Sequence, residues 1–292
     1  MNVERRVSFR KSLDSNDVVF APLALDPLAA LLAEKAGFQA AYLSGGALGF
    51  QYAVSEALLT LTEIVDVARR ITVRCGLPLI VDGGVGFGDP VHVQRAVWEL
   101  ESAGAVALEL EDQVAPKRVH HHVGVEHLIN AEAMCEKISA AVEARTDNNF
   151  LIIARTGAND HENLNSAIER LNRYIGAGAD LVMAFGGNSD LKAISSSVGA
   201  PLSTIASMNR QSSDGWQDVG CSLVIDAFTS QAIMISEVKK SYERFRNGED
   251  SGAKVDGEAL HRELVELCGL DSLLDLEAQT TEKESIVKRM DR

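Results

Sequence analysis

Polar side chains that can bind an anion or a hard cation follow four short apolar runs of the sequence. They are Ser44-Gly45-Gly46, Asp82, Glu111 with Asp112, and Arg155. Carboxylates are hard oxygen ligands for Mg2+, and a guanidinium forms paired hydrogen bonds with a carboxylate or an enolate. We therefore expect Asp82 and Glu111 to be metal ligands and Arg155 to bind substrate and act in catalysis. The backbone of Ser44, Gly45 and Gly46, together with Asp82, completes the expected substrate contacts.

Each of these side chains also has an ordinary structural role open to it. An Asp at the end of a strand is as often a helix cap or a salt-bridge partner as a ligand. Glu111 could instead pair with Lys117 or Arg118. The pattern alone leaves these alternatives open.

A polar, histidine-rich segment over residues 116–126 (PKRVHHHVGVE) is too long for a minimal connection and predicts a lid over a site. Its candidates for catalysis are Lys117, His120 and His121, because histidine titrates near neutral pH and can move protons. The run of three histidines is more typical of a solvated loop than of a metal site. Three adjacent side chains of an extended loop cannot all face one ion.

The segment from Pro78 to Pro90 (PLIVDGGVGFGDP) indicates how these side chains are positioned. An apolar run typical of a strand buried on both faces ends at Asp82 and opens into a glycine-rich turn. Asp89 then caps a predicted helix whose first residue is Pro90. Folds built from such strand–loop–helix units place their chemistry at the carboxyl ends of the strands.

Eight short apolar runs, mostly alternating with helical patterns, predict an α/β fold, a (β/α)8 barrel of the TIM type. Strands are expected over residues 18–25, 40–43, 79–81, 105–110, 150–154, 181–185, 201–206 and 222–227. The barrel is expected to occupy residues 1–246. Residues 247–292 are expected to form a polar linker (NGEDSGAKVDGE) and a C-terminal helical extension, with an amphipathic helix over residues 259–276.

Composition narrows the class of partner and the compartment. The net charge of −14 and the 5% aromatic content argue against nucleic acid and anionic membrane surfaces as partners, but allow a small anionic substrate at a local cation. The four cysteines show no metal-binding spacing and fit reduced thiols. We find no apolar signal core and no run long enough to span a membrane, so we expect a cytoplasmic protein.

At these same residues the chain resembles the isocitrate lyase and phosphoenolpyruvate mutase superfamily. The resemblance rests on LEDQ, IIART and GAGAD segments in the expected order and on a DGGVGFG segment where the family usually has DADTGYG. It implies a (β/α)8 barrel whose extra helix is swapped between subunits, in a homo-oligomer that is a dimer or a tetramer. It also implies that Mg2+ holds a 2-oxo acid or its enolate, that Asp82 and Glu111 belong to the metal shell, and that Arg155 stabilises the enolate.

This chain is a divergent member, because it departs from the family pattern at several polar positions. Gly84 replaces one metal-shell acid, and Ser55 replaces another, although Glu56 beside it could substitute. Loss of carboxylates weakens a Mg2+ site unless the substrate supplies oxygens, so we expect weak or substrate-dependent binding. Val119 stands where the family's C–C lyases have a catalytic cysteine, and we expect His120 or His121 to transfer protons instead.

The expected function is that of an enolate-stabilising lyase or decarboxylase acting on a small 2-oxo or 2-hydroxy (di)carboxylic acid. The alternative enzyme is a phosphonopyruvate-type C–P bond enzyme, a mutase or a hydrolase. From another class, the lost acids favour a catalytically degenerate subunit that binds a metabolite or serves in assembly. The two enzyme hypotheses differ from the third in requiring turnover.

Overall fold

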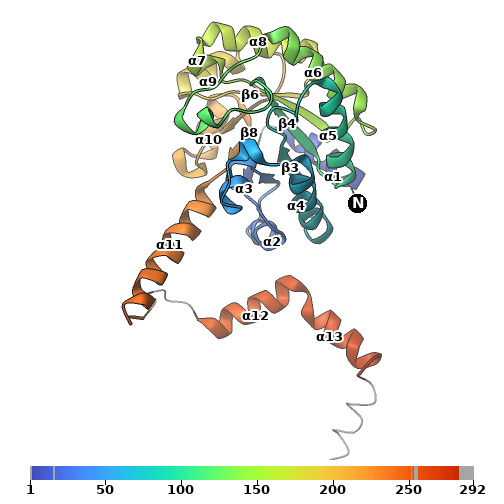
Figure 1. The fold of residues 1–292 in the computed structure, drawn as a ribbon. Coiled ribbons are helices and arrows are strands. Elements are labelled where there is room, and N and C mark those ends of the chain that lie inside the picture. The colour runs from blue at the N-terminus through green and yellow to red at the C-terminus, as the bar shows by residue number, and fades with distance from the viewer. Residues whose placement is uncertain (1, 16, 251, 253–255, 283–292) are drawn as a thin grey trace, which may run out of the picture. The chain divides into compact units, whose positions relative to one another are not determined.

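Short apolar runs form eight parallel strands in the part of the chain that the structure describes (Figure 1). The structure is a computed structural model that describes residues 2–15, 17–250, 252 and 256–282. From β2 to β8 each strand is hydrogen-bonded to the next, and β1 pairs with β8, with Val19 opposite Leu223. An isolated bridge between Leu23 and Tyr42 joins the two ends of the sheet, which forms a barrel. The strands are β1 (Val19–Pro22), β2 (Ala41–Leu43), β3 (Leu79–Asp82), β4 (Ala107–Glu111), β5 (Leu151–Arg155), β6 (Leu181–Met183), β7 (Leu202–Ile205) and β8 (Cys221–Asp226).

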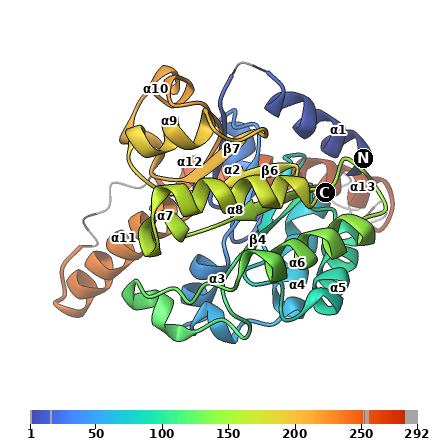
Figure 2. The ribbon, with the colours of Figure 1, turned by 90° about the horizontal axis from the view of Figure 1, so that it is seen from above.

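Helices follow the strands and surround the barrel (Figure 2). Capping side chains set where several of them begin: Asp26 accepts from the Ala29 N–H, and Thr60 and Glu63 form a reciprocal capping box. The helices of this ring are α2 (Pro27–Lys35), α3 (Gly45–Gln51), α4 (Leu61–Arg74), α5 (Pro90–Ser102), α6 (Ala131–Ala144), α7 (Ala158–His161), α8 (Leu164–Gly176), α9 (Asn188–Ser195), α10 (Ser213–Asp218) and the start of α11 (Thr229–Arg246).

Successive strand residues alternate between two apolar layers, one outside the strands and one inside the barrel. Inside, Ile80 and Ile153 pack with Phe9 and Leu13 of α1 (Asn2–Leu13). Arg6 of the same helix donates to the carbonyl of Ala105, just before β4. Helix α1 therefore covers the end of the barrel where the strands begin, and the opposite end carries the polar strand termini.

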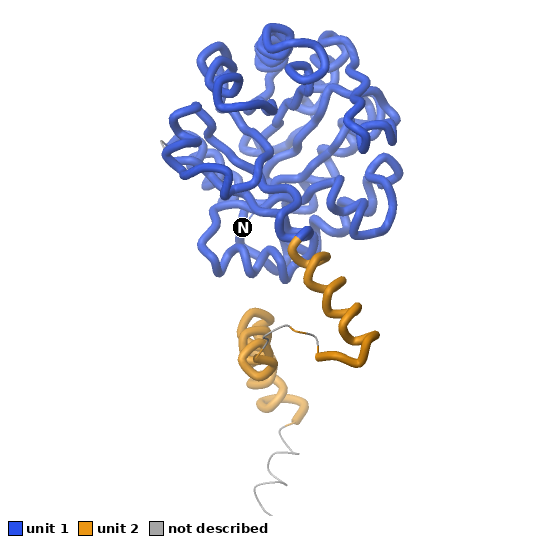
Figure 3. Tube along the Cα trace, turned by 90° about the vertical axis from the view of Figure 1, so that its left-hand side faces the viewer, with its two compact units in different colours: residues 1–232 blue, residues 233–292 orange. Residues whose placement is uncertain are grey.

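The chain divides into two compact units, residues 1–232 and residues 233–292 (Figure 3). The division falls within α11, earlier than the expected boundary after residue 246, because the α11 side chains beyond Gln231 are largely exposed. In the second unit, two helices replace the one expected over residues 259–276, since Gly269 adopts φ 66° and ends the first of them. They are α12 (Gly257–Cys268) and α13 (Leu270–Gln279). Linker residues 251 and 253–255 and residues 283–292 of the extension lie outside the described residues.

No helix of the described chain combines the length and the apolar character that crossing a bilayer requires.

Candidate active site

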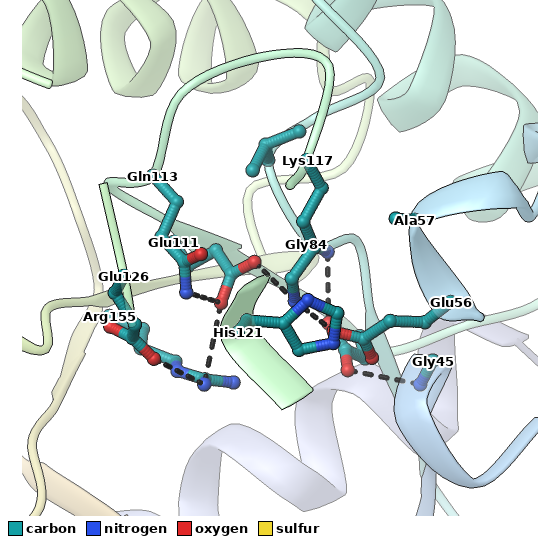
Figure 4. Close-up of polar contacts among 12 residues, drawn as sticks. Gly45, Glu56, Ala57, Gly84, Glu111, Gln113, Lys117, His121, Glu126 and Arg155 are labelled. Atoms are coloured by element: carbon teal, nitrogen blue, oxygen red, sulfur yellow. Dashed lines mark hydrogen bonds and ion pairs between the residues drawn. The ribbon is translucent and has the colours of Figure 1, made fainter. Parts of the chain in front are cut away.

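The carboxyl ends of the strands surround a cavity of about 280 Å³ in which most of the expected site residues meet (Figure 4). The expected residues that line it are Ser44, Gly46, Asp82, Lys117, His121 and Arg155. The other lining residues are Tyr42, Glu56, Gln113, His122, Glu126, Phe185, Ile205, Ala227 and Phe228.

The Ser44-Gly45-Gly46 segment is the start of helix α3, with Ser44 at the N-cap. The Ser44 Oγ accepts from the Ala47 N–H at 3.2 Å. A Cβ on Gly45 would lie 3.2 Å from Asp82 Oδ2, and a Cβ on Gly46 would lie 2.9 Å from Glu56 Oε2. The glycines therefore allow α3 to lie directly against two carboxylates.

Asp82, buried at the end of β3, accepts two backbone hydrogen bonds. The Gly45 N–H donates to Oδ2 at 3.0 Å, and the Gly84 N–H donates to Oδ1 at 2.9 Å. Burial raises the pKa of Asp82, and the negative charge of Glu56 adds to the shift. Both oxygens of this carboxylate are thus engaged by the backbone.

Glu111 and Arg155 end β4 and β5 and face each other in the ladder. Arg155 Nη2 lies 3.3 Å from Glu111 Oε2, and Gln113 Nε2 donates to the same oxygen at 3.1 Å. Burial would lower the pKa of Arg155, but the charges of Glu111 and Glu109 outweigh it and hold that pKa well above its usual value. Arg155 is therefore a permanent cation in the cavity wall.

Glu109 and Tyr42 hold Arg155 from inside the barrel. Arg155 Nη1 donates to Glu109 Oε1 at 3.0 Å, and the Tyr42 hydroxyl donates to Glu109 Oε2 at 2.7 Å. Burial, together with the charge of Asp82, raises the pKa of Glu109 to about 7. The guanidinium carbon of Arg155 also lies 4.8 Å from the centroid of the Phe185 ring, so the group is fixed on two sides.

The lid segment contains a 3₁₀ turn, Val119–Val123, and brings Lys117 and His121 to the cavity. Lys117 Nζ forms ion pairs with Glu111 Oε1, at 2.6 Å, and with Glu56 Oε1. His121 Nε2 lies 2.9 Å from the same Glu56 oxygen. Burial would raise the pKa of Glu56, but His121 and Lys117 lower it to about 2. Contact with Glu56 raises the pKa of His121.

The other two lid histidines are placed differently. His120 is exposed and does not line the cavity; its ring lies 6.0 Å from that of His127. His122 does line the cavity, and its Nε2 lies 2.9 Å from Ser55 Oγ. Of the two histidines expected to transfer protons, the structure brings His121 to the site and leaves His120 outside it.

Sequence reasoning missed Glu109, Tyr42, Gln113 and Glu126 as parts of the site. A signal for Glu109 exists, because it lies two residues before Glu111 on a buried strand and must face the same side. Glu126 comes from the lid, and its Oε1 lies 3.9 Å from Arg155 Nη2. Glu126 does not follow a predicted strand, so its place in the site could not be predicted from the sequence and depends on the path of the lid.

Comparison with known proteins places this barrel among its relatives. The family model of phosphoenolpyruvate phosphomutase matches residues 9–246. The chain belongs to this family. It is 45% identical over 174 residues to a 2-methylisocitrate lyase of Aeropyrum pernix, an alignment covering 59% of this chain and 56% of that protein. It is 32% identical over 272 residues to a 2-methylisocitrate lyase of Halalkalibacterium halodurans, covering 90% of this chain and 89% of that one.

A solved structure shares the fold of this chain. It is a phosphonopyruvate hydrolase in complex with oxalate and Mg2+, with a TM-score of 0.84 and 28% identity over 95% of this chain and 99% of that chain. The (β/α)8 barrel and the superfamily expected from the sequence are thereby confirmed.

The described residues of this family member do not fit a Mg2+ ion in the way the resemblance implies. Asp82 is engaged by two backbone N–H groups, while Glu111 is engaged by Lys117 on one oxygen and by Arg155 and Gln113 on the other. Within the described residues no group of three or more His, Cys, Asp or Glu is arranged to hold a metal ion. A metal at this pair of carboxylates would lie beside two cations, Lys117 and Arg155, that already contact Glu111.

Proposed function

We propose that this protein stabilises an enolate and acts as a lyase or decarboxylase on a small 2-oxo or 2-hydroxy (di)carboxylic acid. The observation that carries the proposal is the guanidinium of Arg155 in the cavity wall, fixed by Glu109, Glu111 and the Phe185 ring. A donor held in place in this way binds a carboxylate or enolate oxygen without having to reorganise during the reaction. The lyase relatives support the same chemistry.

The other cavity residues take proposed roles around Arg155. In decarboxylation, the bond to the carboxylate that leaves as CO2 breaks, and its electron pair becomes the enolate of the remaining 2-oxo acid. In cleavage of a 2-hydroxy acid, the hydroxyl gives its proton to a base and becomes the carbonyl of one product, while the electron pair of the broken C–C bond becomes the enolate of the other. Arg155 and Lys117 balance the charge of the enolate in both cases. His121 is the proposed acid or base, because it lines the cavity beside Glu56 and has a raised pKa. Ser44 and Gly46 are proposed substrate contacts. Gly45 and Asp82 bind each other and would act by shaping the wall between them.

Magnesium remains a prediction for this chain. Its support is the likeness to a hydrolase with oxalate and Mg2+ bound, and Asp82 and Glu111 are the residues that would hold it. Because both carboxylates already have partners, the proposed mechanism contains no step through a metal. The geometry is compatible with Mg2+ binding in which the substrate supplies some of the oxygen ligands.

The alternative activity is phosphonopyruvate-type C–P bond chemistry, which the likeness to phosphonopyruvate hydrolase favours. The same fixed guanidinium would serve there, because the reaction also generates a pyruvate enolate. The two activities differ in their products. Release of phosphate from phosphonopyruvate, or its rearrangement, would favour the alternative over the lyase.

The test is calorimetric titration of oxalate, which mimics the enolate of pyruvate, followed by turnover assays on a panel of acids. The panel contains 2-methylisocitrate, oxaloacetate and phosphonopyruvate. We expect wild type to bind oxalate and to cleave an acid of the panel, and Arg155→Gln to weaken both by about 100-fold, the loss of a charged bidentate contact. The control is Arg70→Gln, whose exposed pair with Asp66 lies on α4.

Outcomes of these titrations separate the three hypotheses. Oxalate binding with no turnover of any acid would favour a metabolite-binding subunit. Absence of oxalate binding both with and without Mg2+, or equal binding by Arg155→Gln, would contradict the enolate site itself.

We also propose that the protein is a homo-oligomer held together by its C-terminal helices. The support is a set of exposed apolar side chains on α12 and α13: Leu260, Leu270, Leu273, Leu274 and Leu276. A swapped arrangement in a dimer or tetramer and a cytoplasmic location remain predictions.

A further inference from the structure

The ammonium group of Lys117 lies where two acids of the expected metal shell converge. Its side chain is 9% exposed, and Nζ is paired with Glu56 Oε1 and with Glu111 Oε1. A buried cation with two carboxylate partners at contact distance already supplies what a metal would supply to those carboxylates, namely compensating charge.

The smaller of the two cavities beside Asp82 is unsuited to a hydrated divalent ion. A second cavity of about 150 Å³ shares Glu56, Asp82 and Lys117 with the first. Its remaining side chains are apolar and cannot accept hydrogen bonds from the waters that Mg2+ retains. They are Ala57, Leu59, Ile64, Val85, Phe87 and Pro116.

At position 84, where the family has a metal-binding acid, this chain has a glycine, and the space for a side chain is open. A Cβ built on Gly84 would meet nothing closer than Glu111 Oε1, at 3.9 Å. Its φ of 49° is one that Asp and Asn adopt more readily than other side chains. An Asp at position 84 is therefore sterically possible. The site lacks a carboxylate there although the structure has room for one.

We propose that the Lys117 ammonium is the resident cation of this site, in the place of a divalent metal ion. The inference rests on the proposed function, because the ammonium would balance the charge of the enolate together with Arg155. Lys117 belongs to the lid segment, so the lid supplies this cation to the site. Removing Lys117, or restoring an acid at position 84, should turn the site into one that binds a divalent ion.

The experiment measures Mn2+ binding by the full chain after treatment with a chelator, with free Mn2+ quantified by electron paramagnetic resonance. We expect wild type to bind no more tightly than about 1 mM, and Lys117→Met and Gly84→Asp each to tighten binding about tenfold or more, through the added net negative charge. Gly84→Asn keeps the shape of the aspartate without its charge and should not tighten binding. Arg118→Met removes an exposed charge of the same lid and should not tighten it either.

Three results would overturn the inference. The first is one equivalent of Mn2+ bound by wild type in the micromolar range. The second is unchanged affinity in both Lys117→Met and Gly84→Asp with their folds intact by circular dichroism. The third is equal tightening in Gly84→Asn. If one variant does not fold, the wild-type affinity and the other variant still decide the matter.

Oxalate titration in the presence of chelator distinguishes this inference from the proposed function. Oxalate binding by metal-free wild type supports both. Oxalate binding only with added Mg2+ would overturn the Lys117 inference and leave the enolate site standing. A gain of Mn2+ binding by the variants, with no oxalate binding by wild type, would support Lys117 as the resident cation while the proposed function fails.

Discussion

Glu109 makes the interior of this barrel sensitive to pH near neutrality. Its pKa is about 7 in the folded protein, where burial, Asp82, Arg155 and Tyr42 act on it, against about 4.3 in an unfolded chain. Because the folded-state pKa is the higher one, the stability that this group contributes is complete below about pH 4 and is lost as the pH rises through 7. The carboxyl group is neutral in the form that the fold prefers.

Glu109→Gln should therefore gain stability relative to wild type as the pH increases. The variant stays neutral, so the difference between the two free energies of unfolding should shift by about 3 kcal/mol between about pH 4.5 and pH 8. Urea unfolding of both proteins across this range measures it. The exposed Glu237→Gln, on α11, should show a constant difference; a constant difference for Glu109→Gln would contradict the prediction.

Substitution of the two neighbouring lid histidines should affect kcat differently. His121→Asn should lower kcat by about 100-fold, in the range for loss of a general acid or base, because His121 lines the cavity beside Glu56. His120→Asn should leave kcat unchanged, because its side chain is exposed outside the cavity. Steady-state kinetics over a pH range measures both, and a shared loss would argue for a role of the lid backbone.

Residues at strand ends were the predictable part of the site. The places of Asp82, Glu111 and Arg155 at one end of the barrel follow from the sequence, because the carboxyl ends of parallel strands in a barrel meet at the same end. Which lid histidine faces inward, and that Lys117 pairs with both Glu56 and Glu111, depends on the path of a loop. Loop paths are not set by any periodicity in the sequence.

At the scale of elements, the closeness of α3 to the site depends on small residues. A Cβ on Gly49 would lie 2.7 Å from the backbone N of Glu56 and 3.0 Å from the carbonyl O of Val54. Gly49→Ala must push the segment carrying Glu56 away, and should cost about 1–3 kcal/mol of unfolding free energy. It should also weaken oxalate binding.

Gly176→Ala is the matched control for that substitution. It lies in α8 with no atom within 4 Å of a built Cβ, so it should leave stability unchanged or raise it by up to about 1 kcal/mol. Urea unfolding reports both variants. Equal stability of Gly49→Ala and wild type would show that the segment yields without strain.

Strand positions were predictable, while α3 was not. Its first five residues, Gly45 to Gly49, include three glycines, each of which disfavours a helix by about 1 kcal/mol, so the sequence does not indicate a helix there. Burial of the whole turn against Asp82 and Glu56 overrides that preference. The break at Gly269 between α12 and α13 was missed for the opposite reason, because the apolar periodicity continues across it.

At the scale of the whole molecule, the C-terminal helices should determine assembly. We expect the full chain to be a dimer or tetramer and a chain ending at residue 246 to be smaller, because α12 and α13 have no buried residue and carry exposed leucines. Light scattering coupled to size-exclusion chromatography measures the mass, and circular dichroism confirms that the shortened chain is folded. Equal subunit numbers for both chains would contradict the proposal.

Closure of the barrel pairs two strands, β1 and β8, that are synthesised far apart in time. The main partner of β1 is β8, with Val19 opposite Leu223, about 200 residues later. At roughly 5–20 residues per second the first strand waits on the order of 10–40 s for that partner to leave the ribosome. Its unpaired edge is open to wrong pairing for the whole interval. Substitutions in β8 should therefore show first as lost yield of soluble protein during expression, before they are visible in the stability of the purified barrel.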